Sequence, residues 1–360
     1  AEACYRQAIS LKPDFSEALN NLGITLKHLG RLEEAEASYR QVLALSSNDV
    51  EAMLDLSIVL NNMNKTESEI YSLQKVLQID TNDRGLRARV RLGILKFLED
   101  DFLESKKQLL AANKIQEKTT FEFQNEKIFH GYLLDILRWH KDQTFDDPNR
   151  SIIKNLYVIG ESHSLISHQL HVKCLDDNFL CKSFLVLGCK QWDLGTHGKN
   201  QYKNKFENIF SSLPKSSEVL LAIGEIDCRL DSGIIKHKNK FPEKDLNMLI
   251  NTTIENYLSY ICEQNVVGQH RIVIQGVPCP NIDTTNITQN DIRQLIEVIK
   301  IFNDELKKKT KERGFRFLDL HKLTDRGDGF SNAIWHVDNI HLSPDGMLEA
   351  WRRYASSEVR

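Results

Sequence analysis

The chain lacks the cysteine pattern of a disulfide-stabilised or metal-binding protein. Its 360 residues contain seven cysteines, none in a Cys-x-x-Cys pair and none with the spacing of metal ligands. An odd number of cysteines also argues against a closed disulfide framework. Reduced thiols of this kind are typical of a cytoplasmic protein, so we expect a cytoplasmic location.

Charge of one sign and long apolar runs are also missing. The formal net charge is −3, so no basic field favours nucleic acid or an anionic membrane as a partner. The longest apolar runs stop well short of the roughly 20 residues that a membrane-spanning helix needs. No phosphate-cradling motif is visible either, and we expect neither a metal nor an organic cofactor.

The sequence has the composition of an ordinary globular protein, with 41% hydrophobic and 27% charged residues, and its length leaves room for two domains. Its first third repeats itself: AEACYRQAISLKPD, from Ala1, recurs as AEASYRQVLALSSND, from Ala35, at an offset of 34 residues. Two amphipathic helical patterns joined at Gly30 make up one repeat. Small residues such as Gly23 fall where helices must approach closely, and Leu22, Leu26 and Tyr39 are expected to fill the space between them.

This repeat resembles the tetratricopeptide repeat family through L-x-x-L-G-x-x-L, from Leu19, and through the spacing of Ala35 and Tyr39. The resemblance implies an all-α helical solenoid over residues 1–113, with a truncated first repeat. Such stacks bind peptides or a neighbouring domain on their concave face. We therefore expect a protein or peptide partner for the repeats, or a scaffolding role.

The chain changes character after the repeats. Apolar periodicity predicts a capping helix at residues 121–140, and DDPNR at residues 146–150 breaks it, so that residues 114–150 form a cap and linker. From residue 151 to 360, strand-like runs alternate with helical patterns, notably at residues 246–264 and 288–313. The predicted strands are NLYVIG at 155–160, SFLVLG at 183–188, EVLLAIG at 218–224, HRIVIQGVP at 270–278 and FRFLDL at 315–320. This alternation predicts a three-layer α/β domain with a parallel sheet.

In such sheets ligands bind at the carboxyl ends of the strands, and reactive side chains follow three of the predicted ones. Glu161, Ser162 and His163 follow the first strand, residues 225–229 (EIDCR) the third, and residues 338–341 (DNIH) stand in the loop after the last. A serine becomes a nucleophile when a base removes its proton and a carboxylate orients that base.

Ser162, His341 and Asp338 supply these three parts, because an Asp three residues before a His in a tight loop can reach its Nδ1. Here the sequence resembles the SGNH/GDSL hydrolases, with GES at residues 160–162 in place of GDS and DNIH matching D-x-x-H. The resemblance implies a flavodoxin-like fold, with Ser162 as nucleophile, His341 as general base and Asp338 as its orienting acid. The α/β-hydrolase alternative is weaker, since its G-x-S-x-G elbow requires glycine where Ser164 stands.

Other roles for these residues stay open. Ser162 or Ser164 can simply cap the helix that follows the first strand. His336 is a second candidate base. His163 is predicted either to line the substrate pocket or to have a structural role.

The oxyanion hole departs from the family pattern. By resemblance, its donors are the N–H groups of Ser162 and of Gly188, with Gly195 as the alternative glycine, but the Asn of the family's GxND motif is absent. Asp227 stands near that position and only accepts when ionised, whereas Arg229 is a strong donor. We expect Asp227 and Arg229 to form a pair that binds substrate.

The resemblance to the SGNH/GDSL hydrolases implies a serine esterase that hydrolyses or transfers an O-acyl group, such as acetyl, and we expect it to need no cofactor. The family resemblance implies an acylated small molecule or glycan as substrate. The alternative is a catalytically weak or inactive SGNH-like binding module in which the repeats carry the function.

Overall fold

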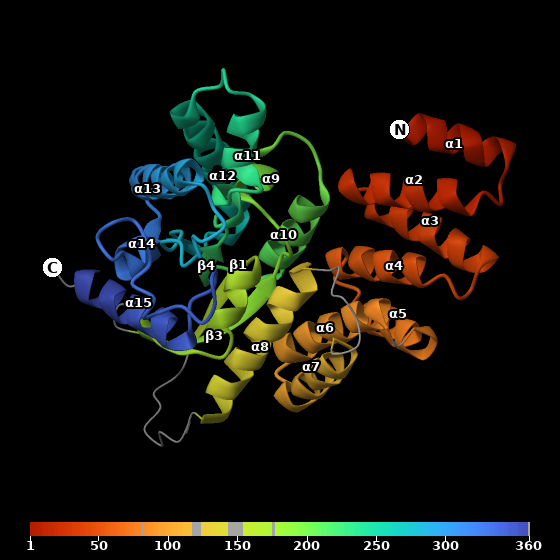
Figure 1. Ribbon diagram of the computed structural model, residues 1–360, viewed down its shortest axis with the longest axis horizontal. Helices are drawn as coiled ribbons and strands as arrows, with labels where there is room; N and C mark the ends of the chain where they lie inside the picture. Colours follow the sequence, from red (N-terminus) through yellow and green to blue (C-terminus); the bar gives the residue numbers. More distant parts are fainter. Residues whose placement is uncertain (81, 117–123, 143–153, 175–176, 359–360) are drawn as a thin grey trace. The chain divides into compact units, whose positions relative to one another are not determined.

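The computed structural model describes residues 1–80, 82–116, 124–142, 154–174 and 177–358. Helices come first along the chain, and a sheet with helices follows (Figure 1). The chain divides into two compact units, residues 1–137 with 198–208, and residues 138–197 with 209–360. The predicted linker at residues 146–150 lies outside the described residues.

The first unit contains the helical repeats. Its helices are α1 (Glu2–Leu11), α2 (Ser16–His28), α3 (Leu32–Leu45), α4 (Val50–Asn62), α5 (Thr66–Ile79), α6 (Asp83–Leu98) and α7 (Phe102–Gln116). Consecutive helices pack in pairs, α2 against α3, α4 against α5 and α6 against α7. The predicted all-α repeat array is confirmed.

Close approach within a repeat depends on a small residue. A Cβ added to Gly23 in α2 would lie 2.8 Å from the ring of Tyr39 in α3. Tyr39 and Ala35 are fully buried, and Leu22 and Leu26 pack in the same core. These are the residues that the sequence pattern placed between the helices.

The helix predicted at residues 121–140 is α8 (Gln124–Asp142), and its predicted first residues, 121–123, lie outside the described part of the chain. Nε2 of the buried His130 lies 2.9 Å from the carbonyl oxygen of Leu109 in α7. This contact fits the predicted capping of the last repeat.

The second unit is built on one six-stranded sheet in the order β2-β3-β1-β4-β5-β6. Its strands are β1 (Lys154–Gly160), β2 (His171–Cys174), β3 (Asp177–Leu185), β4 (Glu218–Ala222), β5 (Arg271–Gln275) and β6 (Arg316–Leu318). All neighbouring pairs except β2 with β3 are parallel. Without β2 this is the flavodoxin-like order, and the predicted α/β class with a parallel sheet is confirmed.

One strand prediction needs correction, and one strand was not predicted. The strand expected at residues 183–188 is the last part of the longer β3, and it ends at Leu185. The antiparallel edge strand β2 was not predicted. It has four residues, too few for a periodic pattern, and only its pairing with β3 makes it a strand.

Helices flank this sheet (Figure 1). The larger ones are α11 (Gly233–Lys240), α12 (Leu246–Gly268), α13 (Gln289–Glu312) and α15 (Pro344–Glu358), and the shorter ones are α9 (Gln191–Gly195), α14 (Leu320–Thr324), η1 (Ser162–Ser167) and η2 (Ile226–Cys228). The helix α10 (Gln201–Ser212) has residues in both units. The side chains of Asp245 and Thr288 cap α12 and α13, so the helices predicted there are confirmed. No helix among the described residues has both the length and the apolar character needed to cross a membrane.

The carboxyl ends of β1 and β4 meet at the centre of the sheet. Gly160, the last residue of β1, is paired in register with Ala222. A Cβ on Gly160 would lie 2.3 Å from the carbonyl oxygen of Ala222, so only glycine fits. The segments that follow β1 and β4 therefore start side by side, at the switch point where flavodoxin-like folds bind ligands.

Candidate active site

Ser162 is the first residue of the short helix η1, directly after β1. The residue before it, Glu161, caps η1 by accepting the backbone N–H of His163. Glu161 therefore fills the capping role that the sequence left open for Ser162. Ser162 is 7% exposed, and its hydroxyl faces two other side chains.

The first of these is His341, held in turn by Asp338. Nε2 of His341 lies 2.9 Å from Oγ of Ser162, and Nδ1 lies 2.8 Å from Oδ2 of Asp338. The other oxygen of Asp338 accepts the backbone N–H groups of Ile340 and His341, at 2.7 and 2.6 Å. The structure thus brings the three predicted catalytic residues into one hydrogen-bonded chain.

The protonation states of Asp338 and His341 suit proton transfer from Ser162. Burial would raise the pKa of Asp338, but the hydrogen bonds and the attraction from His341, together with the backbone N–H of Ile340, outweigh burial and lower the pKa to about 2. Burial lowers the pKa of His341 below its usual range, although Asp338 opposes this. At neutral pH the imidazole is therefore uncharged. With its Nδ1 proton donated to Asp338, Nε2 presents a lone pair to Ser162.

The second partner of Ser162 is Glu161. Oγ of Ser162 lies 2.5 Å from Oε2 of Glu161. A serine hydroxyl has only one proton to donate, so Glu161 and His341 compete for it. For His341 to accept that proton, the hydroxyl must turn away from Glu161.

Glu161 also forms a buried pair with His163. Nδ1 of His163 lies 2.5 Å from Oε1 of Glu161, and the side chains are 3% and 2% exposed. Burial would lower the pKa of His163 and raise that of Glu161. Their mutual attraction and hydrogen bond act in the opposite direction and prevail, so the pKa of His163 is raised and that of Glu161 is lowered. The two groups therefore form an ion pair.

His163 was predicted to bind substrate or to have a structural role. Its Nε2 lies 3.2 Å from the carbonyl oxygen of Ile340, to which the protonated ring donates. Because both ring nitrogens are committed to the protein, the structure does not support direct contact with substrate. His163 instead links the serine loop to the loop that carries Asp338 and His341.

Arg229 pairs with Glu225, and the predicted pair with Asp227 is wrong. Nε of Arg229 lies 2.9 and 2.7 Å from the two carboxylate oxygens of Glu225, and Nη2 lies 2.5 Å from one of them. The two residues are four positions apart across the helical turn η2, which brings their side chains together. The predicted pair does not form because this turn is helical and places Arg229 beside the residue four positions earlier.

Asp227 has a different task. Its carboxylate accepts the backbone N–H groups of Gln191 and Trp192, at 2.7 and 3.2 Å, at the start of α9. The residue is fully buried, and burial raises its pKa to about 7 in spite of these hydrogen bonds. Asp227 therefore anchors α9, and its predicted contact with substrate has no support in this arrangement.

The predicted oxyanion donors follow adjacent strands. Gly188 lies in the turn after β3 with φ +73°, a conformation that favours glycine. Because β3 pairs with β1, Gly188 and Ser162 leave the sheet at the same edge. The alternative, Gly195, packs against α12, where an added Cβ would lie 2.8 Å from Cβ of Asn256. The prediction that the N–H groups of Gly188 and Ser162 together form the oxyanion hole stays a prediction.

The other candidate base, His336, has another partner. Its Nδ1 lies 2.9 Å from Oγ of Ser331, and burial lowers its pKa to about 4. The structure places His341 beside Ser162.

One group of side chains in the described ranges has the spacing of metal ligands. Ligand atoms of Glu161, His163 and Glu225 lie within 4.8 Å of one another. Their contacts are made inside the protein, however, since Glu161 pairs with His163 and Glu225 with Arg229. We interpret this group as parts of two neighbouring ion pairs, of which Glu161 also contacts Ser162, and assign no metal to it.

The parts played by Glu161 and Glu225 were not predicted from the sequence. Glu161 was taken only as a substitution in the family motif, and Glu225 was given no role. A signal was present: Gly160-Glu161 and Gly224-Glu225 repeat one dipeptide after two strands, which turn out to be neighbours. That adjacency brings the two carboxylates to the same place.

Comparison with known proteins supports the repeats directly. Residues 4–37 match the family model described as a tetratricopeptide repeat. No curated protein matches the sequence.

Solved structures resemble the chain at low sequence identity. A GDSL-like lipase from Bacteroides thetaiotaomicron has 11% identity and a TM-score of 0.37, covering 63% of this chain and 98% of its own. A phospholipase A1 from Streptomyces albidoflavus has 14% identity and a TM-score of 0.35, covering 57% of this chain and 100% of its own. A tetratricopeptide repeat protein from Parabacteroides merdae has 12% identity and a TM-score of 0.35, covering 87% of this chain and 80% of its own. The activities in these names are those of the named proteins.

Proposed function

We propose that the second unit is a serine esterase of the SGNH/GDSL type. The observation that carries this proposal is the hydrogen-bonded chain from Oγ of Ser162 through His341 to Asp338. A buried, uncharged imidazole between a serine hydroxyl and an ionised carboxylate is the arrangement that activates serine as a nucleophile.

In this mechanism Oγ of Ser162 attacks the ester carbonyl carbon while Nε2 of His341 accepts the hydroxyl proton. The C–O bond to the leaving alcohol breaks as His341 returns the proton to the alcohol oxygen, which leaves an acyl group on Ser162. A water molecule then attacks the acyl carbon while Nε2 of His341 accepts its proton. The bond from that carbon to Oγ breaks as His341 returns the proton to Ser162, and the acid is released. Asp338 holds the ring and stabilises its charged form throughout.

The negative oxygen that develops on the substrate needs aimed N–H donors. We assign this role to the backbone N–H groups of Ser162 and Gly188. Arg229 is the third candidate: its side chain is 27% exposed, and its Nη1 has no hydrogen-bond partner among the described residues. Arg229→Lys would lower kcat and kcat/KM together if the guanidinium stabilises the transition state, and would raise KM alone if it only holds substrate.

The substrate class comes from the family resemblance. We propose an O-acyl group, such as acetyl, on a small molecule or glycan. Acyl transfer to a second glycan differs from hydrolysis only in that a sugar hydroxyl takes the place of water. Product analysis with a glycan acceptor separates the two reactions.

A fluorophosphonate probe tests the central assignment, because it labels an activated serine covalently. We expect a single adduct on Ser162, and no adduct in Ser162→Ala. Ser164→Ala, two residues further along η1 and fully buried, is the matched control and should keep the label. Labelling at any other serine would refute the proposed nucleophile.

A binding module is the second candidate function. The repeats contain a cavity of about 410 Å³ between α3, α4 and α5, with Tyr71 62% exposed at its edge. An opening of this size can hold part of a peptide, and we propose a protein or peptide partner for this unit. If Ser162→Ala hydrolyses aryl acetate as fast as the wild-type protein does, the esterase proposal is wrong and only the binding function remains.

A further inference from the structure

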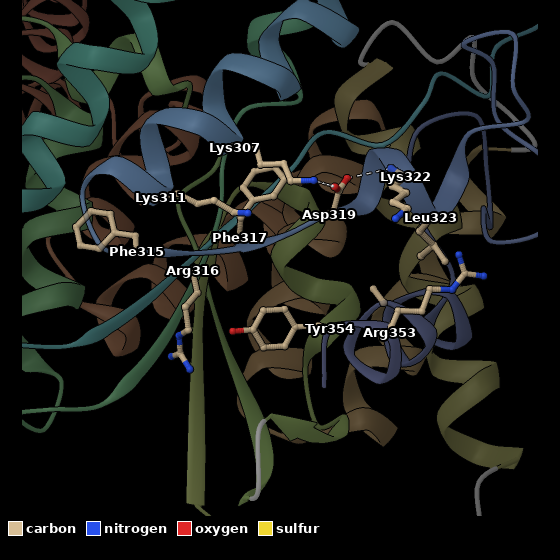
Figure 2. A pocket seen from close by; sticks show the side chains of 11 residues that line it. Lys307, Lys311, Phe315, Arg316, Phe317, Asp319, Lys322, Leu323, Arg353 and Tyr354 are labelled. Carbon is tan, nitrogen blue, oxygen red and sulfur yellow. Dashed lines mark hydrogen bonds and ion pairs between the residues drawn. The ribbon is translucent and has the colours of Figure 1, made fainter. Parts of the chain in front are cut away.

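The second unit has a cavity of about 490 Å³ that contains no residue of the Ser162 site. It lies along the edge strand β6, between the second half of α13 and the α14 and α15 helices. In Figure 2 three lysines lie along its upper wall, with Tyr354 and Arg353 along the lower one. Cavities of this size commonly hold small molecules.

The lining of this cavity is strongly cationic. Five of its eleven residues carry positive charge and one carries negative charge: Lys307, Lys311, Arg316, Lys322 and Arg353 against Asp319. Lys307 is paired with Asp319 at 2.7 Å. The side chains of Lys311 and Lys322 make no hydrogen bond or ion pair with any described residue.

The arginines are only partly neutralised. Glu218, the partner of Arg316, is shared with Arg271. Glu349, the partner of Arg353, is likewise shared with Arg352. Each carboxylate thus faces two guanidinium groups, and the positive charge around the cavity exceeds the negative charge.

Helix ends explain only part of this pattern. Lys311 is in the last turn of α13 and Lys322 in the last turn of α14, where cations offset the helix dipole. That effect does not require the two helix ends to face one cavity together with Arg353. An unpaired anion at this place would meet three cationic side chains.

The remaining lining is aromatic and aliphatic. Phe317 and Tyr354 are buried residues whose rings border the cavity, and Phe315, Leu323 and Ala350 complete it. Lys311, Lys322 and Arg353 are exposed, whereas Phe317 and Tyr354 are buried, and this combination matches a ligand that has an anionic end and a flat or apolar body.

We propose that this cavity binds a soluble organic phosphate, with its phosphate groups on Lys311, Lys322 and Arg353 and its body against Phe317 and Tyr354. Lysine and arginine are the side chains that bind phosphate most strongly. The proposal is independent of the esterase assignment, since the two sets of residues do not overlap.

Calorimetric titration of the full chain with ATP and with inorganic tripolyphosphate tests the proposal. We expect ATP to bind several-fold more tightly than tripolyphosphate, because only ATP offers a ring to the apolar wall. The variant Lys311→Glu/Lys322→Glu should weaken ATP binding at least tenfold. The matched control is Lys300→Glu/Lys308→Glu, with the same charge change at two exposed positions of α13 outside the cavity, and it should change binding less than twofold.

Three outcomes would overturn the proposal. One is the absence of ATP binding at millimolar concentration to the folded wild-type chain. The second is equal weakening in both double variants, which would mean non-specific attraction. The third is binding confined to vesicles of anionic phospholipid, which would make the basic cavity a membrane-contact surface. Melting curves of both variants verify that each is folded.

Discussion

Ser162 lies between a neutral histidine and an ionised glutamate, and the balance between them decides when it can react. His341 accepts a proton only while it is uncharged, and burial lowers its pKa. As the pH falls through that lowered pKa, His341 becomes protonated and activity is lost. We therefore expect the acid limb of kcat/KM to have its midpoint below the ordinary histidine value of about 6.5.

A pH profile of aryl acetate hydrolysis measures this midpoint. The profile of Asp338→Asn should have much lower kcat in a folded protein, because the imidazole loses the group that fixes its tautomer. A wild-type midpoint above about 6.5 would contradict the buried, uncharged His341.

The pair of Glu161 and His163 gives a second prediction at this scale. Glu161→Gln removes the counter-charge of a buried, protonated histidine, so we expect the variant to lose about 3 kcal/mol of unfolding free energy in urea titration. Glu161→Asp restores the family motif and keeps the charge but is one methylene shorter, and we expect a smaller loss.

A double-mutant cycle separates the pair from general damage. Glu161→Gln combined with His163→Gln should cost clearly less than the two single changes added together, because the second change removes the uncompensated charge. Strict additivity would mean that the two side chains do not interact.

At the scale of elements, Asp227 links η2 to α9. Its folded pKa of about 7 is above the usual aspartate value of about 3.9. The folded protein therefore holds a proton that the unfolded chain has lost, and stability falls as the pH rises from about 4 to 7. In Asp227→Asn this part of the decline should disappear.

Thermal melts of both proteins across that range test the assignment. Parallel curves for Asp227→Asn and wild type would show that Asp227 ionises normally.

At the scale of the whole molecule, the helical repeats depend mainly on contacts between neighbours. The core around Tyr39 is formed by residues from α2, α3 and α4, with no contribution from the sheet. We expect a fragment of residues 1–142 to give a helical circular dichroism spectrum and a cooperative melt. An unfolded fragment beside a stable full chain would show that the repeats need the second unit.

Local patterns in the sequence determined the repeats, the parallel strands and the three residues of the proposed triad. Gly23 and Tyr39 could be placed in the repeat core because helix packing requires a small residue opposite a large one at fixed spacing. Ser162 could be named because it directly follows β1, and Asp338 and His341 because their D-x-x-H spacing before the last helix resembles the SGNH/GDSL pattern. In a parallel sheet such positions converge at one edge.

Tertiary structure alone decided which side chains face each other at that edge. Three features could not be predicted from the sequence. They are the helical turn that brings Arg229 to Glu225, the direction in which the Asp227 side chain points, and the pairing with β3 that makes β2 a strand. The short distances from Glu161 and His163 to Glu225 were likewise decided by the tertiary structure. Those distances follow from how β1 and β4 pack, and because packing acts between residues far apart in the chain, no local pattern records it.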